Sequence, residues 1–188
     1  MQKRTLKTRA RLLAAAAEVV ESGGFEALRV EEVVQTAGVA KGTFFAHFKD
    51  KDALMEILIG EKLSACFDSV EAGSSPQNVH QIVVALEPIH SFMMSERYVF
   101  DLILRYSGAA GIAEIGPIAQ CFERYFRLVS DWLKTAQLRQ DIPADLQAEG
   151  VQAFALQAMS LKFCALHSAS TFTDRLEGYL IAWLTPAK

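Results

Sequence analysis

Long apolar segments are missing from this chain. No run of about eighteen apolar residues occurs in its sequence, so we expect no membrane-spanning helix. The apolar stretch that starts at Leu12 is short, and Glu18 and Glu21 interrupt it, which excludes a secretory signal peptide. We therefore expect a cytoplasmic protein with no membrane partner.

Cysteine is scarce. Cys66, Cys121 and Cys164 lie far apart, and no two cysteines form a C-x-x-C pair. This spacing argues against a disulfide framework and against a zinc site. We expect three buried thiols in a reducing compartment, and the alternative is a redox sensor built on one of them.

Residue patterns that support catalysis are also absent. The sequence has no defensible Ser-His-Asp arrangement, no phosphate-binding loop and no His/Cys metal spacing. His80, His90 and His167 lie far apart. We therefore predict a protein that is not an enzyme, with no catalytic residues, no cofactor and no bound metal.

Charge is distributed unevenly, although the net charge is only −3. Residues 1–51 contain nine Lys or Arg against six Asp or Glu, whereas residues 52–188 contain ten against sixteen. A basic head on an acidic body can orient a protein on phosphate without coating every polyanion. The alternative is a solvated basic tail, but this tail leads directly into the motif described next, which favours DNA.

Residues 28–54 contain a pattern typical of a helix-turn-helix. Two segments with helical apolar spacing, VEEVVQTA and AKGTFFAHF, are joined by Gly38 and Val39. Phe44 and Phe48 lie four residues apart, so both can point into the core of the head. The residues left outside on the second helix are Lys41, Gly42, Thr43, Phe45, Ala46 and His47. Small, cationic and aromatic groups of this kind can enter a major groove.

Residues 5–58 also contain five short motifs in a fixed order, namely TR-x-x-L, GGF, AGV, KGT-x-x-x-x-F and K-x-x-L. This ordered set resembles the DNA-binding head of TetR/AcrR-type transcriptional regulators. The resemblance implies an all-α fold of about nine helices. A three-helix helix-turn-helix head would occupy residues 1–51, and a larger helical effector-binding and dimerisation body would occupy residues 52–188.

The resemblance also assigns roles within the head. Lys41, Gly42 and Thr43 would start the recognition helix, and Lys51 would grip a backbone phosphate. His47 stands where the family often touches phosphate, and its alternative is a half-buried ring that supports Phe44. The predicted DNA-binding residues are Arg29, Lys41, Gly42, Thr43, Phe45, His47 and Lys51.

Three positions depart from the family pattern. Phe45 replaces a common Tyr, so a hydroxyl bond to phosphate is lost. Ala40 replaces a common Ser, which removes the N-cap of the recognition helix at a cost of roughly 1 kcal/mol. Val34 replaces a usual Ala near the helix crossing. Arg29 stands where a Ser or Thr cap is usual; it cannot accept N–H bonds, but it can reach phosphate.

The body is predicted to be helical throughout, with Asp50 as N-cap of its first helix and Ser75 as N-cap before Pro76. The predicted helices span residues 50–70, 76–94, 96–106, 112–137, 144–167 and 173–184, with breaks at 107–111 and 138–143. No flexible linker separates head from body, so the first of these helices belongs to both and head orientation can depend on the body.

By the family resemblance, the last two helices would form a dimer interface, because two heads related by a two-fold axis read a palindrome. Small residues among larger apolar ones would permit close approach, and the alternative is ordinary core within one chain. The candidate interface residues are Val151, Phe154, Ala155, Ala158, Met159, Leu166, Tyr179 and Trp183.

The middle helices would hold an effector pocket, with plain core packing as the alternative for each aromatic or Met side chain. The segment HSFMM offers adaptable apolar surface suited to a hydrophobic ligand. Arg105 would be costly to bury unpaired, so it is exposed, paired with an acid or facing a ligand carboxylate. The candidate ligand residues are His90, Phe92, Met93, Arg105, Tyr125, Trp132 and Phe163.

The predicted function is that of a sequence-specific, ligand-responsive repressor. It would bind a palindromic operator in double-stranded DNA as a homodimer, and a small hydrophobic effector would be its third partner. Two alternatives stay open. One is a ligand-independent architectural or protein-recruited DNA-binding factor, and the other is an activator of the same fold.

Overall fold

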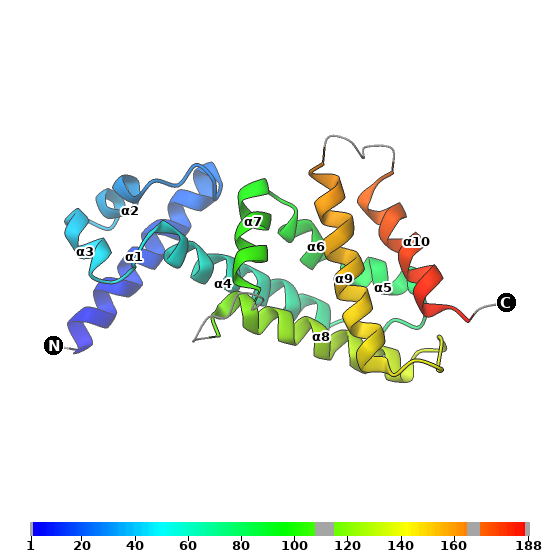
Figure 1. Cartoon of the computed structure of the whole chain (residues 1–188). Helices are drawn as coiled ribbons and strands as arrows, with labels where there is room; N and C mark the ends of the chain where they lie inside the picture. Colours follow the sequence, from blue (N-terminus) through cyan, green and yellow to red (C-terminus); the bar gives the residue numbers. More distant parts are fainter. Residues whose placement is uncertain (1, 108–114, 165–169, 187–188) are drawn as a thin grey trace. The chain divides into compact units, whose positions relative to one another are not determined.

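The structure, a computed structural model, describes residues 2–107, 115–164 and 170–186. Within these ranges it contains ten α-helices and no strand, which confirms the predicted all-α class (Figure 1). The helices are α1 Gln2–Gly23, α2 Val30–Thr36, α3 Lys41–Phe45, α4 Lys51–Glu71, α5 Val79–Ala85, α6 Glu87–Met93, α7 Arg97–Tyr106, α8 Pro117–Thr135, α9 Ala144–Lys162 and α10 Phe172–Leu184.

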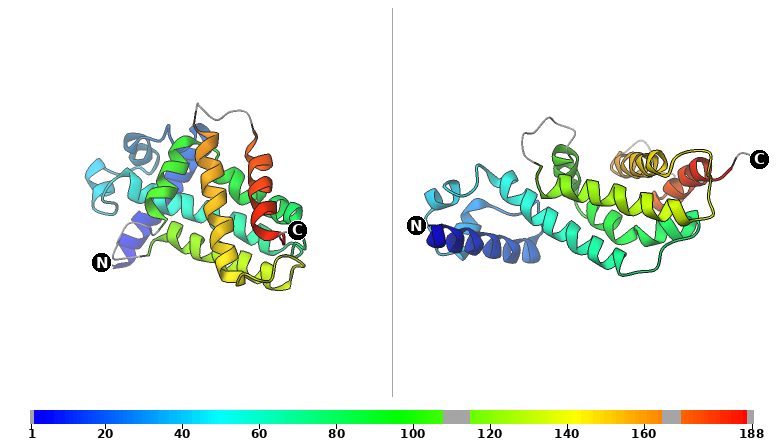
Figure 2. Two further views of the ribbon diagram at one scale, coloured as in Figure 1. Left: turned by 45° about the vertical axis from the view of Figure 1, so that its right-hand side comes forward. Right: turned by 90° about the horizontal axis from the view of Figure 1, so that it is seen from below.

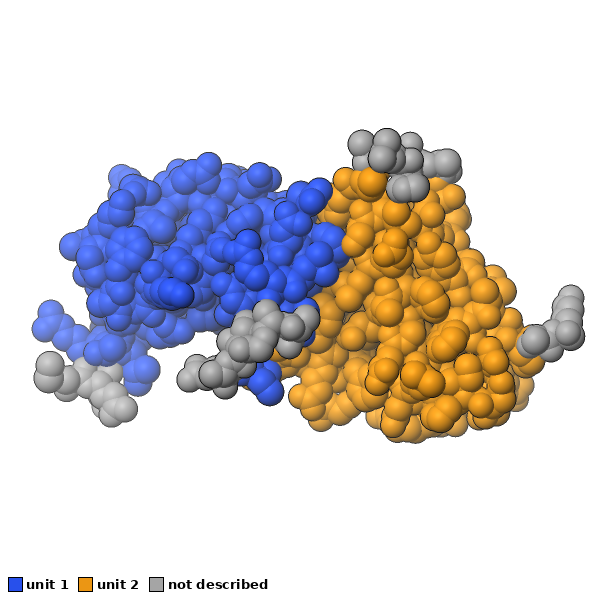
Figure 3. Space-filling model, in the orientation of Figure 1, with its two compact units in different colours: residues 1–62, 96–118 blue, residues 63–95, 119–188 orange. Residues whose placement is uncertain are grey.

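The chain divides into two compact units, coloured separately in Figure 3. Unit 1 consists of Met1–Lys62 and Glu96–Ile118, and unit 2 consists of Leu63–Ser95 and Ala119–Lys188. Helix α4 contributes residues to both units, as predicted for the helix that begins near Asp50. The predicted division of function at residues 51 and 52 concerns roles rather than compactness, and it stays a prediction.

Unit 1 is built around side chains that α1, α2, α3 and α4 bury together. Leu12, Leu28, Val33, Phe44 and Leu54 are each 0% exposed. Burying one such side chain contributes about 1.5–3 kcal/mol relative to leaving it in water, so these contacts dominate the stability of the head. Helix α1 begins at Gln2 rather than near Thr5, because the preceding Lys and Arg residues are good helix formers.

Two glycines make the corners of unit 1. Gly24 follows α1 with φ of +85°, and Gly38 joins α2 to α3 with φ of +62°. Both values lie in the left-handed region, where a side chain is disfavoured. The predicted need for Gly38 at the helix-turn-helix corner is confirmed. Asp50 also caps α4 as predicted, since its Oδ1 accepts from the backbone N–H of Ala53 at 2.8 Å.

The predicted helix over residues 76–94 is wrong in two respects. Its N-cap is Asn78, which accepts from the N–H of Gln81, whereas Ser75 and Pro76 precede the helix. The segment is then divided at Leu86 into α5 and α6. Pro88 explains the division, because it has no N–H to continue the hydrogen-bond ladder of α5.

The C-terminal helices agree closely with the predicted ranges. Helix α8 starts at Pro117, where the predicted delay at Gly116 and Pro117 is confirmed, while residues 108–114 lie outside the described residues. Helix α9 ends at Lys162, and the predicted end at His167 falls outside the described residues. Helix α10 is capped by Thr171, which accepts from the N–H of Asp174 at 3.1 Å. Helices α9 and α10 lie side by side in both views of Figure 2.

The cysteines differ from the prediction. Only Cys121 is buried, whereas Cys66 and Cys164 are half-buried. Burial raises the pKa of the Cys121 thiol to about 11, so Cys121 is not a thiolate at neutral pH. Among the described helices, none is both long and apolar enough to cross a membrane.

Candidate functional site

The recognition helix α3 is held by one face and leaves the other exposed. Phe44 is 0% exposed and Phe48 is 3% exposed, with ring centroids 5.4 Å apart, so both predicted inward positions are confirmed. Phe45 is 51% exposed and meets the Phe44 ring edge-on at 5.2 Å. The sequence FF therefore puts one ring in the core and the next on the surface.

The exposed face of α3 starts with Lys41, Gly42 and Thr43. Lys41 forms an ion pair with Glu31 of α2 in which both side chains are exposed, and this bond lowers the pKa of Glu31. Such a pair is weak enough to exchange for phosphate. A Cβ added at Gly42 would meet no atom within 4 Å, so packing within the described residues does not require glycine there. Ala40 provides no side-chain cap, as predicted.

The end of α3 is tied to α1 by an arginine that sequence reasoning counted only as part of a basic tail. Arg9 donates from Nη1 to the carbonyl of His47 at 2.9 Å, and its guanidinium lies 4.5 Å from the centroid of the Phe48 ring. The side chain of His47 is half-buried. Arg11 similarly donates to the carbonyl of Ala37. The TR-x-x-L motif was the only sequence signal for these contacts.

Arg29 occupies the N-cap position of α2 without capping it, as predicted. Its Nη1 instead donates to the carbonyls of Glu26, Ala27 and Leu28 at 2.9, 2.8 and 3.2 Å. The guanidinium thus orders the loop before α2 while remaining exposed. Its predicted contact with phosphate stays a prediction.

Lys51 is positioned by groups from two segments of unit 1. Its Nζ lies 4.6 Å from the centroid of the Tyr98 ring and 3.3 Å from the carbonyl oxygen of Glu26. Partial burial, and after it the nearby charge of Arg29, lower the pKa of Lys51. A cation that is partly stripped of water and fixed over a ring is prepared to bind an anion.

Helix α7 is attached to the head by the carboxylate of Glu96, its N-cap residue. Oε1 accepts from the backbone N–H of Phe25 at 2.9 Å, and Oε2 accepts from that of Glu26 at 2.8 Å. A Cβ added at Gly24 would lie 2.9 Å from Oε1, so the left-handed glycine also makes room for this carboxylate. Nothing in the local sequence indicated the contact, because about seventy residues separate the partners.

A second attachment of α7 involves Asp52 at the start of α4. The Tyr98 hydroxyl donates to Asp52 at 2.9 Å, and Arg105 forms an ion pair with the same carboxylate. Arg105 was a candidate ligand residue. It is exposed and paired with an acid, and it is not among the residues that line the cavity described next. We therefore correct its role to a contact between α7 and α4.

Unit 2 contains a cavity of about 320 Å³ between α4, α6, α8 and α9. Three of the candidate ligand residues, His90, Met93 and Tyr125, line it, whereas Phe92, Trp132 and Phe163 do not. The full lining comprises Leu63, Phe67, Ile89, His90, Met93, Cys121, Phe122, Tyr125, Gln152, Ala155, Leu156 and Met159. The predicted pocket in the middle helices thus has a physical counterpart, while ligand binding there stays a prediction.

His90 and Tyr125 form a buried polar pair on the wall of this cavity. The Nε2 atom of His90 lies 3.1 Å from the Tyr125 hydroxyl, and His90 is 1% exposed. Burial lowers the pKa of His90 to about 3 and raises that of Tyr125, so both rings are neutral at physiological pH. The other ring nitrogen, Nδ1, has no hydrogen-bond partner in the part of the chain that the structure describes.

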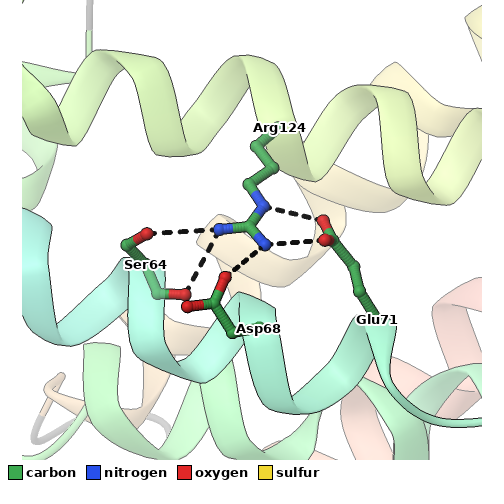
Figure 4. Close-up of polar contacts among 4 residues, drawn as sticks. All are labelled: Ser64, Asp68, Glu71 and Arg124. Atoms are coloured by element: carbon green, nitrogen blue, oxygen red, sulfur yellow. Dashed lines mark hydrogen bonds and ion pairs between the residues drawn. The ribbon is translucent and has the colours of Figure 1, made fainter.

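Arg124, another cation of unit 2, is engaged elsewhere, as Figure 4 shows. Its guanidinium binds both carboxylate oxygens of Glu71 at 2.7 and 2.6 Å and reaches Asp68 at 2.7 Å. It also donates to the backbone and the hydroxyl of Ser64. These bonds tie α8 to α4 and hold the pKa of Glu71 below its usual range. Arg124 therefore has a structural role and does not line the cavity.

The candidate dimer residues do not share one environment. Val151, Ala155, Ala158 and Met159 are at most 2% exposed within one chain, so they line the interior of unit 2 and are corrected to core residues. The half-buried aromatic residues are Phe154, Tyr179 and Trp183, whose rings lie 5.3 and 6.0 Å from one another around Phe154. Leu166 lies outside the described residues.

Comparison with known proteins agrees with this geometry. Residues 12–58, which contain the helix-turn-helix, match the family described as bacterial regulatory proteins, tetR family. The HTH-type transcriptional regulator YvdT of Bacillus subtilis (strain 168) is 28% identical over 134 residues, which cover 71% of this chain and 67% of YvdT.

Solved structures have the same fold. FadR of Thermus thermophilus, a TetR family repressor in complex with lauroyl-CoA, superposes with a TM-score of 0.63 at 20% identity, covering 92% of this chain and 91% of FadR. RolR in complex with resorcinol gives 0.70 at 15% identity, covering 98% and 90%. The chain is thus a TetR-type transcriptional regulator, which confirms the family predicted from its motifs.

Proposed function

Since the chain carries a tetR-family head, we propose that it is a ligand-responsive repressor that binds a palindromic operator in cytoplasmic DNA as a homodimer. The observation that carries this proposal is the two-sided recognition helix. Phe44 and Phe48 fix the inner face of α3, so Thr43 and Phe45 project from a rigid surface. A helix presented in this way can place a few side chains against base edges in a major groove.

Phosphate contacts would come from cations around that surface. Lys51 is fixed between Tyr98 and the Glu26 carbonyl, and Lys41 can exchange Glu31 for phosphate. These charges carry no sequence information, but they would set the register of the head on the duplex. Arg29 and His47 would supplement them.

Dimerisation would use the outward side of α9 and α10. Leu146 and Ile181 are each 49% exposed, and the rings of Phe154, Tyr179 and Trp183 are half-buried beside them in the sequence of these helices. An apolar surface of this kind suits a two-fold interface between copies. Two heads could then read half-sites one helical turn apart, about 34–36 Å.

The effector would bind the cavity of unit 2. Proteins of the same fold were solved with lauroyl-CoA and with resorcinol, which supports a ligand in this body without identifying it. Helix α6 carries His90 and Met93 on the cavity wall, and α7 follows it after three residues. Because Glu96 and Tyr98 attach α7 to the head, a displacement of α6 would be felt by Lys51 and the corner before α2. For release of DNA, the ligand must bind the DNA-incompetent state more tightly.

Lys51→Ala tests the placement of the head on DNA. We expect weaker binding to all duplexes, by about tenfold or more at moderate salt, because a positioned phosphate contact is lost in each protomer. The slope of log affinity against log salt should become shallower by about 2 per dimer. Fluorescence anisotropy with an operator duplex and a random duplex at several salt concentrations measures both quantities.

Lys62→Ala is the matched control, since Lys62 is an exposed lysine on the same helix, three turns further on. It should leave the salt slope unchanged. If Lys51→Ala and Lys62→Ala gave equal slopes, the contact assigned to Lys51 would be wrong. Thr43→Ala should instead alter the choice of operator more than the affinity for random DNA.

A further inference from the structure

A buried histidine with one unused nitrogen stands in the wall of the unit 2 cavity. His90 is 1% exposed, and its Nε2 is paired with Tyr125 at 3.1 Å. Its Nδ1 has no partner among the described residues. Leaving a buried polar atom unsatisfied is costly, and native proteins seldom do so without a ligand, a water or a function to explain it.

The surroundings of this atom limit what can satisfy it. The cavity lining includes no Lys, Arg, Asp or Glu. Its polar side chains are His90, Tyr125 and Gln152, and the Gln152 amide already donates to the carbonyl of Phe122 at 3.3 Å. A charged ligand would lose its hydration without gaining an opposite charge, which costs several kcal/mol, of order. A neutral molecule faces no such penalty.

The pairing with Tyr125 favours one kind of polar group. A buried phenol hydroxyl needs an acceptor, and Nε2 is its hydrogen-bond partner here. If the hydroxyl donates to Nε2, then Nδ1 carries the proton and needs an acceptor; in the other tautomer Nδ1 needs a donor. A hydroxyl group on the ligand serves either case, since it both donates and accepts. A carbonyl serves only one.

The size and chemistry of the remaining wall complete the description. Leucine, isoleucine, methionine and phenylalanine side chains surround a space of about 320 Å³, at the lower end of the range for small-molecule sites. Thioether and aromatic groups adapt readily to a flat apolar body. The space suits a compact molecule better than a long acyl chain with a charged carrier.

We propose that the cavity binds a small, uncharged, mostly apolar molecule with one hydroxyl group, of the class of alkylphenols, and that this hydroxyl bonds to Nδ1 of His90. The proposal rests on the ligand-responsive function above and assigns the chemical class of the effector. His90 and Met93 lie on α6, so the same contact would act directly on the helix that precedes α7.

Isothermal titration calorimetry with two probes of equal shape tests the proposal. For the full-length protein we expect 4-ethylphenol to bind at least about tenfold more tightly than ethylbenzene, the loss expected when a buried hydrogen bond goes unmade. Partitioning alone would favour ethylbenzene, the less water-soluble probe. Neither 4-ethylbenzoate nor lauroyl-CoA should bind as tightly as 4-ethylphenol.

Substitutions identify the atom responsible. The double variant His90→Leu/Tyr125→Phe leaves no unpaired member of the buried pair, and it should bind both neutral probes with similar affinity. Met93→Leu conserves volume on the same wall and should keep the tenfold preference. Helical circular dichroism checks that each variant is folded, and Tyr125→Phe alone serves if the double variant is not, with a preference reduced but not abolished.

Four results would overturn the proposal: equal affinity for the two neutral probes, tighter binding of the benzoate or of lauroyl-CoA, no binding of any probe, and a preference that survives in the double variant. Operator affinity without ligand is measured on the same preparation. If palindromic DNA is bound while the phenol fails, only the assigned ligand class falls; if DNA is not bound, the proposed regulator itself falls.

Discussion

Phe44→Ala should abolish operator binding, whereas the neighbouring Phe45→Ala should leave the fold intact and change only how DNA is read. Phe44 is 0% exposed, and truncating a fully buried Phe costs about 3–5 kcal/mol. Whole domains are stable by only about 5–15 kcal/mol, so the head would be largely unfolded or mobile. Chemical denaturation and anisotropy with an operator duplex measure the two effects.

Phe45 is the matched control, being the same residue type at the next position of the same helix. It is 51% exposed, so its loss should cost at most the edge contact with Phe44, about 0.5–1.5 kcal/mol. Operator affinity should nevertheless fall relative to affinity for random DNA. Equal destabilisation by the two substitutions would contradict the orientation of α3 described above.

Glu96→Ala should destabilise unit 1 by about 1–3 kcal/mol, because two backbone N–H groups lose their common acceptor. The amides of Phe25 and Glu26, bonded to this carboxylate at 2.9 and 2.8 Å, should exchange with solvent faster than in the wild type. Hydrogen exchange followed by NMR resolves both amides, and denaturant unfolding gives the change in free energy.

Asp101→Ala is the control for Glu96→Ala. Asp101 is another acid of α7, and its bond to Arg97 is an exposed i, i+4 pair worth about 0.3–0.5 kcal/mol. It should alter neither the stability nor the exchange of Phe25 and Glu26 beyond that amount. If Glu96→Ala behaved like Asp101→Ala, α7 would not be the element that fixes the corner before α2.

The head could be predicted in detail because its determinants are local. The inward positions of Phe44 and Phe48, the turn at Gly38 and the cap at Asp50 each depend on neighbours within a few residues. Short-range spacing therefore carried enough information. The contact of Glu96 with the same corner depends on residues about seventy positions away, and no periodicity encodes such a pairing.

In the body, the pattern was ambiguous where two arrangements satisfy the same local rule. Ser75-Pro76 and Asn78 both resemble helix starts, and only the packing of Val79 and Ile82 decides for Asn78. Likewise, a stripe of small and apolar residues on α9 fits an interface or a core equally well. The burial of Val151 and Met159 within one chain decides for the core.

The cavity shows the same division. His90, Met93 and Tyr125 were predictable as members of an apolar middle region, since helical spacing brings them together. The pairing of His90 with Tyr125, and the atom that it leaves unused, required three-dimensional placement of α6 against α8. Arg105 was misassigned because its partner, Asp52, lies on α4 at a long sequence distance.

The most direct test of the account is selection of bound sequences from a random duplex pool with the full-length protein, followed by affinity measurements at two salt concentrations. We predict an enriched palindrome whose half-sites lie one helical turn apart, bound more tightly than random DNA by about a thousandfold or more. Binding that depends on salt but enriches no motif would contradict sequence-specific recognition by α3, and an enriched site without two-fold symmetry would contradict the dimer.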